Sequence, residues 1–270
     1  MGTGIAESCL LAGYEVILVD PLPGARESGR EKVGAFLRRT EEKGRIQAGQ
    51  AEALLAKLKT GTGLELLAGA ELVIQAAPED QALKQDLFRR LDKVCPPPAV
   101  LASNTSSIPI GRLAAATKNP ERVLGLHFMN PVPLMPLVEL IASKSSSTPA
   151  LVAARELCAR LGKRACECAD LPGFVANRLL MPFINEAALL LEQGAATAED
   201  IDAIMKLGAR HPMGPLELAD FIGLDTCVSI LELLQKELKQ DRFKPAALLK
   251  DLVLKGKLGR KSGEGFYRHG

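Results

Sequence analysis

Short aliphatic runs along the first part of the chain predict buried strands of a sheet. They lie at residues 14–20, 70–77, 100–102, 123–126, 137–141 and 163–168. Between them, apolar residues at helical spacing predict helices, among them one that ends at Gly13, one over 83–94 and one over 150–161. The alternation of helices and strands predicts an α/β fold with a doubly wound sheet.

The strand pattern disappears after the loop at residues 170–173. Beyond it, apolar residues at helical spacing predict helices over 174–193, 216–222 and 226–238, and Thr197 is placed to cap another that runs to Leu207. The sequence therefore predicts two domains, at residues 1–172 and 173–270, the second all-helical. Its apolar faces exceed the need of one small bundle, which indicates self-association.

Residues 24–59 are charged and favour helices, with a break between Gly44 and Gly49. One interpretation is a pair of solvated helices whose basic and acidic residues alternate. The other is a projecting helical arm that meets a phosphate-bearing substrate. The sequence leaves both open.

The composition of the chain argues against several classes of function. The net charge is only +2 and Trp is absent, which argues against nucleic-acid and membrane-surface binding. No apolar run reaches the roughly 20 residues that cross a bilayer. The six cysteines form no C-x-x-C pair and there are only three histidines, so we expect no metal site. Reduced thiols indicate an intracellular protein.

Polar residues follow successive strands at the edge where parallel sheets bind ligands. Ser106 follows one such strand and His127 ends the next, while Glu139 lies on a returning strand that can place it beside His127. A carboxylate beside an imidazole fixes its tautomer and raises its pKa, as a general base requires. The alternatives are that Ser106 only caps a helix and that Glu139 is an edge-strand charge.

The beginning of the chain resembles half of a dinucleotide-binding unit. A helix leads to a strand that ends at Asp20, an acid placed to bind ribose hydroxyls if Gly2 is the third glycine of G-x-G-x-x-G. We therefore expect the first strand and first two glycines to precede Met1. Glu79, after another strand, could contact nicotinamide ribose or favour a helix N-terminus.

Four separated motifs together resemble the NAD-dependent L-3-hydroxyacyl-CoA dehydrogenases, especially the short-chain 3-hydroxybutyryl-CoA type. They are residues 102–107, 125–133 with 137–139, 172–178 and 211–216, in the same order along nearly the whole chain. The resemblance implies a Rossmann-type sheet that lacks its first strand in this chain, followed by an all-α substrate and dimerisation domain.

The resemblance also implies residue roles. His127 would be the general base and Glu139 its partner, while Ser106 and Asn177 would hold the substrate and Lys43 would approach the coenzyme A nucleotide. The positions that match cofactor contacts are Gly2, Asp20, Glu79, Lys84, Asn104 and Asn130.

The expected function is interconversion of (S)-3-hydroxyacyl-CoA and 3-oxoacyl-CoA with NAD, in fatty-acid or butanoate metabolism. The resemblance implies a homodimer formed through the C-terminal helices, and we expect a cytoplasmic protein, with the mitochondrial matrix as the alternative. Two rival functions stay open: a catalytically silent relative that binds nucleotide or serves structurally, and a dehydrogenase of a 3-hydroxy acid without coenzyme A.

Overall fold

The structure is a computed structural model that describes the backbone of residues 1–270 and every side chain except that of Pro23. The chain forms two compact units, Met1–Asp170 and Leu171–Gly270. Each unit has its own apolar core, and each is described by itself.

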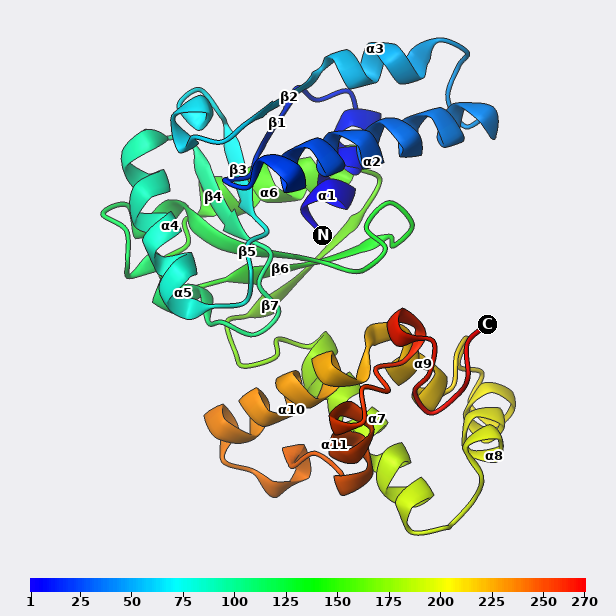
Figure 1. The fold of residues 1–270 in the computed structure, drawn as a ribbon. Helices are drawn as coiled ribbons and strands as arrows, with labels where there is room; N and C mark the ends of the chain where they lie inside the picture. The colour runs from blue at the N-terminus through cyan, green and yellow to red at the C-terminus, as the bar shows by residue number, and fades with distance from the viewer. The chain divides into compact units, whose positions relative to one another are not determined.

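The first unit alternates helices and strands, as the sequence predicts (Figure 1). Its elements are α1 (Gly2–Leu11), β1 (Val16–Val19), α2 (Pro23–Glu42), α3 (Gln50–Ala56), β2 (Leu58–Gly61), β3 (Leu72–Gln75), α4 (Gln81–Val94), β4 (Val100–Ser103), α5 (Ile110–Ala114), β5 (Val123–Phe128), β6 (Leu137–Ala142), α6 (Thr148–Arg160) and β7 (Arg164–Ala169).

The strands form two sheets. The larger has the order β3-β4-β5-β6-β7, in which β5 and β6 are antiparallel and the other neighbours are parallel. The smaller is the parallel pair β1-β2. Strand β2 corrects the expected end of the helical arm, because Leu58 and Lys59 pair with β1 instead of extending the arm.

Helices cover both faces of the larger sheet. Ile5 of α1 and Ala154 of α6 pack in one apolar cluster with Leu124 and Leu140 of the sheet. On the opposite face α5 lies close to β5, where a Cβ at Gly125 would stand 3.0 Å from the Ile110 side chain. Glycine at this position lets α5 approach the strand that carries His127.

Helices α2 and α3 lie side by side and extend away from the sheets (Figure 1). Val33 and Leu37 of α2 pack against Leu10 of α1 and Leu54 of α3 in a separate apolar cluster. Most charged residues of the pair are exposed, so the arm has one apolar and one solvated face.

The second unit is built from helices, without strands in the part of it that the structure describes. Its helices are α7 (Ala176–Glu192), α8 (Ala198–Ala203), a π-helical turn (Ile204–Gly208), α9 (Pro215–Ile222), α10 (Leu224–Leu238) and α11 (Ala247–Leu254). The Thr197 hydroxyl accepts a hydrogen bond from the Asp200 amide, which confirms the predicted cap. The predicted single helix to Leu207 changes to π-helical geometry at Ile204, and α11 was not predicted.

The glycine-rich C-terminal segment is fixed by a buried carboxylate. Asp220 accepts hydrogen bonds from the amides of Phe266 and Tyr267, each at 2.9 Å, and its Oδ2 lies 2.8 Å from His269 Nε2. These contacts hold the segment as an ordered terminal turn. None of the helices that the structure describes is long and apolar enough to cross a membrane.

Candidate active site

His127 and Glu139 face each other in the middle of the larger sheet. They are direct register partners on the antiparallel strands β5 and β6, and His127 Nδ1 lies 2.7 Å from Glu139 Oε2. Both side chains are buried. The return of the chain from β5 to β6 therefore produces the contact that the sequence predicts.

This contact fixes the chemistry of the imidazole. A carboxylate can only accept, so Nδ1–H donates the hydrogen bond to Glu139, and in this tautomer of the neutral imidazole Nε2 carries no proton. Strand β6 lies between β5 and β7. Glu139 is thus not an edge-strand charge, and that alternative is wrong.

The loop that follows β4 folds around one carboxylate oxygen. Glu79 Oε1 accepts from the Thr105 hydroxyl at 2.5 Å, the Ser107 hydroxyl at 2.6 Å and the Ser107 amide at 3.0 Å. It also accepts from the Ser106 amide at 3.0 Å and the Ser106 hydroxyl at 3.4 Å. Glu79 therefore joins the end of β3 to the loop that carries Ser106.

A buried ammonium group lies on the other side of Glu79. Lys84 Nζ is 3.4 Å from Glu79 Oε2 and donates to the Ala77 carbonyl at 2.9 Å. Burial raises the pKa of Glu79, but the hydrogen bonds from Ser107 and Thr105 and the Lys84 charge outweigh it and hold that pKa below its usual range. Burial lowers the pKa of Lys84, although Glu79 opposes the shift.

Two acidic side chains cap the helices that follow β3 and β4. The cap of α4 is Asp80, which accepts from the Leu83 amide, so Glu79 does not occupy that position. Asp170 accepts from the amides of Ile110 and Gly111 at the start of α5, each at 2.7 Å. Ser106 therefore does not cap α5.

Asn104 links this loop to the strand of His127. Its Oδ1 accepts a hydrogen bond from the amide of Phe128, the residue after His127, at 2.9 Å. The ends of β4 and β5 are thus tied together. Through Asn104, the loop that carries Ser106 is therefore fixed to the strand that carries His127.

The remaining predicted cofactor residues lie at the ends of α1, β1 and β5. Asp20 follows β1, and its Oδ1 accepts from the Leu22 amide at 2.9 Å. Gly2 opens α1 beside Ala76, where a Cβ would make an ordinary contact at 3.5 Å. The closer approach is at Gly4, whose Cβ would stand 3.1 Å from Val132. Asn130 is exposed just after β5.

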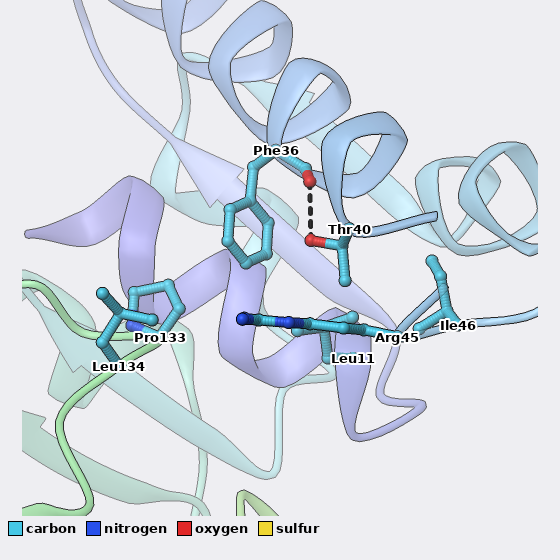
Figure 2. A pocket seen from close by; sticks show the side chains of 7 residues that line it. All are labelled: Leu11, Phe36, Thr40, Arg45, Ile46, Pro133 and Leu134. Atoms are coloured by element: carbon cyan, nitrogen blue, oxygen red, sulfur yellow. Dashed lines mark hydrogen bonds between the residues drawn. The ribbon is translucent and has the colours of Figure 1, made fainter. Parts of the chain in front are cut away.

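A cavity of about 250 Å³ opens beneath the helical arm. In Figure 2, the Phe36 ring and the extended Arg45 side chain face the same space. The lining is completed by Leu11, Thr40, Ile46, Pro133 and Leu134. Lys43, the predicted substrate residue of the arm, is exposed at the end of α2 and does not line this cavity.

Asn177 is the second residue of α7, in the second unit, and its role stays a prediction. Among the described residues, no group of three or more His, Cys, Asp or Glu side chains could hold a metal ion. Sequence reasoning missed Thr105 and Asp170, and it considered Ser107 only as a helix cap, whereas Ser107 donates to Glu79. The dense run of hydroxyl residues at 103–107 was the signal that an acceptor lies nearby.

Comparisons with known proteins agree across both units. Residues 1–171 match the family model described as 3-hydroxyacyl-CoA dehydrogenase, NAD binding domain, and residues 173–269 match that of the C-terminal domain. The chain is 46% identical over 267 residues to the probable 3-hydroxybutyryl-CoA dehydrogenase of Bacillus subtilis, which covers 99% of this chain and 93% of the relative.

Two solved structures have closely similar folds. M. tuberculosis FadB2 gives a TM-score of 0.96 at 43% identity, covering 99% of this chain and 95% of the other. The (S)-3-hydroxybutyryl-CoA dehydrogenase PaaH1 from Ralstonia eutropha gives 0.95 at 41% identity, covering 100% and 95%.

Proposed function

Because the chain belongs to the 3-hydroxyacyl-CoA dehydrogenase family, we propose that it interconverts (S)-3-hydroxyacyl-CoA and 3-oxoacyl-CoA with NAD. The short-chain substrate, 3-hydroxybutyryl-CoA, is supported by the names of relatives such as the one from Bacillus subtilis. The observation that carries the proposal is the buried His127–Glu139 contact at 2.7 Å, next to the loop of Ser106.

In this mechanism His127 is the general base. Its Nε2 accepts the proton of the substrate 3-hydroxyl in oxidation and returns a proton to the 3-oxo oxygen in reduction. Glu139 accepts from Nδ1 and stabilises the imidazolium that forms. The Ser106 hydroxyl hydrogen-bonds the same substrate oxygen.

The first unit has side chains that suit NAD. When bound, NAD supplies the acceptor or donor of the hydride. Asp20 follows β1 and has a second carboxylate oxygen for a ribose hydroxyl, while its charge disfavours a 2′-phosphate. The N-terminus of α1 lies near the end of β3, where helix amides suit a pyrophosphate. Asn130 and Lys84 are proposed to contact the nicotinamide half.

We place part of the coenzyme A in the cavity beneath the arm. Phe36, Ile46 and Leu11 offer apolar walls, and the Arg45 guanidinium offers a planar donor for phosphate oxygens. Lys43, two residues earlier, adds a second positive charge. These features support the substrate-contacting arm over the purely solvated one.

The apolar surface of the second unit supports a homodimer. On α7, Leu179 is 70% exposed and Leu190 is 38% exposed. Leu207, in the π-helical turn, is 83% exposed, and Ile204 nearby is also exposed. We propose that these residues are covered by a second copy of the chain.

The direct test follows NADH oxidation by the purified protein with acetoacetyl-CoA, with NADH binding measured in parallel. We expect turnover with NADH and much less with NADPH. A preference for NADPH would contradict the role of Asp20. Binding of NADH without turnover would favour the catalytically silent relative.

Free acetoacetate as a substrate distinguishes the proposed function from the remaining rival, a dehydrogenase of a 3-hydroxy acid without coenzyme A. One solved structure of the same fold, 30% identical with a TM-score of 0.85, is described as a diketoreductase acting on dicarbonyl compounds. We expect this chain to use the thioester far better than the free acid, because the free acid lacks the coenzyme A that the cavity and Arg45 are proposed to bind. Equal use of both would assign the chain to small 3-hydroxy acids.

A further inference from the structure

Glu79 accepts hydrogen bonds from residues 105–107, and a role in cofactor binding alone does not explain them. All five are made to one oxygen, and they come from three consecutive residues. A carboxylate oxygen rarely has so many donors, so the loop is shaped around this atom. The second oxygen faces Lys84 at 3.4 Å.

The three hydroxyls of the loop are not equivalent. Those of Thr105 and Ser107 are buried and held at 2.5 and 2.6 Å from Glu79. Ser106 is half-buried, and its hydroxyl makes the longest of the contacts, at 3.4 Å. Its amide is nevertheless fixed at 3.0 Å. Glu79 thus holds the backbone of Ser106 more firmly than its side chain.

A second layer of contacts stiffens the same loop. The Thr105 hydroxyl accepts from the Ile108 amide at 3.0 Å, while the Thr105 amide donates to Ser103. Ser103 in turn donates to Gln75, at the end of β3. The loop is therefore anchored to β3 and β4, and Glu79 is its charged anchor.

We infer that Glu79 is a positioning residue: it fixes the loop so that the Ser106 hydroxyl meets the substrate oxygen beside His127. This inference rests on the proposed function and deepens it. A positioning residue and a cofactor contact differ in the kinetic constant that their substitution changes. Loss of a positioning residue lowers kcat, whereas loss of a cofactor contact raises the KM for NADH.

A double-mutant cycle tests the inference in the full-length protein. We expect Glu79→Ala and Ser106→Ala each to lower kcat by at least about tenfold, and the double variant to match Ser106→Ala within about twofold. The KM for NADH should change less than about twofold in Glu79→Ala. Glu79→Gln, which keeps the shape and one acceptor, should recover part of the rate and serves if the alanine variant does not fold.

The control is Asp86→Asn, an exposed acid on α4 that pairs with Arg89, and it should keep the wild-type kcat. If the losses of kcat in Glu79→Ala and Ser106→Ala multiply in the double variant, the inference is wrong. It is also wrong if Glu79→Ala raises the KM for NADH and leaves kcat unchanged.

Amide hydrogen exchange separates this inference from the proposed function. In Glu79→Ala, and to a smaller extent in Glu79→Gln, the amides of Ser106 and Ser107 should exchange about tenfold faster. If the wild-type protein does not reduce acetoacetyl-CoA, the proposed function fails, while faster exchange still shows that Glu79 holds the loop. Unchanged exchange at both amides would overturn the inference whatever the activity.

Discussion

The His127–Glu139 contact gives the proposed mechanism its sharpest residue-level prediction. His127→Gln keeps a polar side chain of similar size beside Glu139 but cannot take a proton from the substrate hydroxyl. We expect kcat to fall by about 10²-fold or more, with NADH affinity within about twofold of wild type. Steady-state kinetics and NADH fluorescence titration measure the two quantities.

Glu139→Gln is the companion variant. It keeps the hydrogen bond to the imidazole but not the negative charge, so an intermediate rate is expected. Near-normal turnover of His127→Gln would show that another group removes the proton.

Glu7, on α1, predicts a pH effect on stability. Burial raises the pKa of this carboxyl from the ordinary 4.5 to about 7. Between these two pH values the unfolded chain has released the proton and the folded chain keeps it, so stability falls as pH rises toward 7. Glu7→Gln removes that dependence. Because this carboxyl is only half-buried, solvent screening reduces the effect, and we expect the advantage of Glu7→Gln in unfolding free energy to grow by on the order of 1 kcal/mol from pH 4.5 to pH 8.

Urea unfolding at the two pH values measures this difference. The control is Glu15→Gln, at an exposed position just before β1. Its unfolding free energy should differ from that of the wild type by nearly the same amount at both pH values. If the difference in unfolding free energy between Glu7→Gln and the wild type is the same at both pH values, the Glu7 carboxyl is already ionised in the folded protein.

At the scale of elements, the helical arm carries a prediction about substrate recognition. Arg45→Ala should raise the KM for acetoacetyl-CoA by about tenfold, because a guanidinium–phosphate contact contributes roughly 1.5–3 kcal/mol. The KM for NADH should stay unchanged. Arg39→Ala, on the same arm and not among the cavity-lining residues, is the matched control. Equal effects of both variants would mean that the arm acts only through its overall charge.

The elements differ in how far their sequences specify them. Strands β4, β5 and β6 were predictable because their aliphatic runs are buried on both faces. Strand β2 was not, because Leu58-Lys59-Thr60-Gly61 is short and polar, and its strand geometry comes from pairing with β1. Helix α11 lies in a segment whose apolar pattern is too short to stand out, and its burial comes from packing on α10.

The contacts of the candidate site could likewise be predicted from the sequence only in part. Glu139 could be placed beside His127 because a short return between two strands allows few arrangements. The contacts of Glu79 could not be predicted, since they join residues 26 to 28 positions apart through a loop without regular structure. Arg45 lines a cavity formed with Pro133 and Leu134, far along the chain. Such tertiary contacts leave no periodic pattern in the sequence.

At the scale of the whole molecule, the exposed leucines of the second unit predict self-association. Leu179→Asp and Leu207→Asp each place a charge on the proposed interface, and burial of an unpaired carboxylate costs several kcal/mol. We expect the wild-type protein to sediment as a dimer and these variants as monomers at micromolar concentration.

Leu254→Asp is the control, because Leu254 is exposed on α11 and is not among the residues of the proposed interface. A monomeric wild-type protein would contradict the dimer.

The separate apolar cluster of the helical arm has a consequence for how the first unit loses its structure. Val33 and Leu37 of the arm pack with Leu10 of α1, while Ile5 of the same helix packs in the cluster of the larger sheet. Parts of a unit with separate clusters can unfold as separate cooperative units. The cavity beneath the arm depends on the first cluster, and the strands of the His127–Glu139 pair depend on the second. Mild heating should therefore weaken the binding of the coenzyme A part of the substrate while the catalytic pair is still folded, and bound acyl-CoA should delay that first transition by mass action.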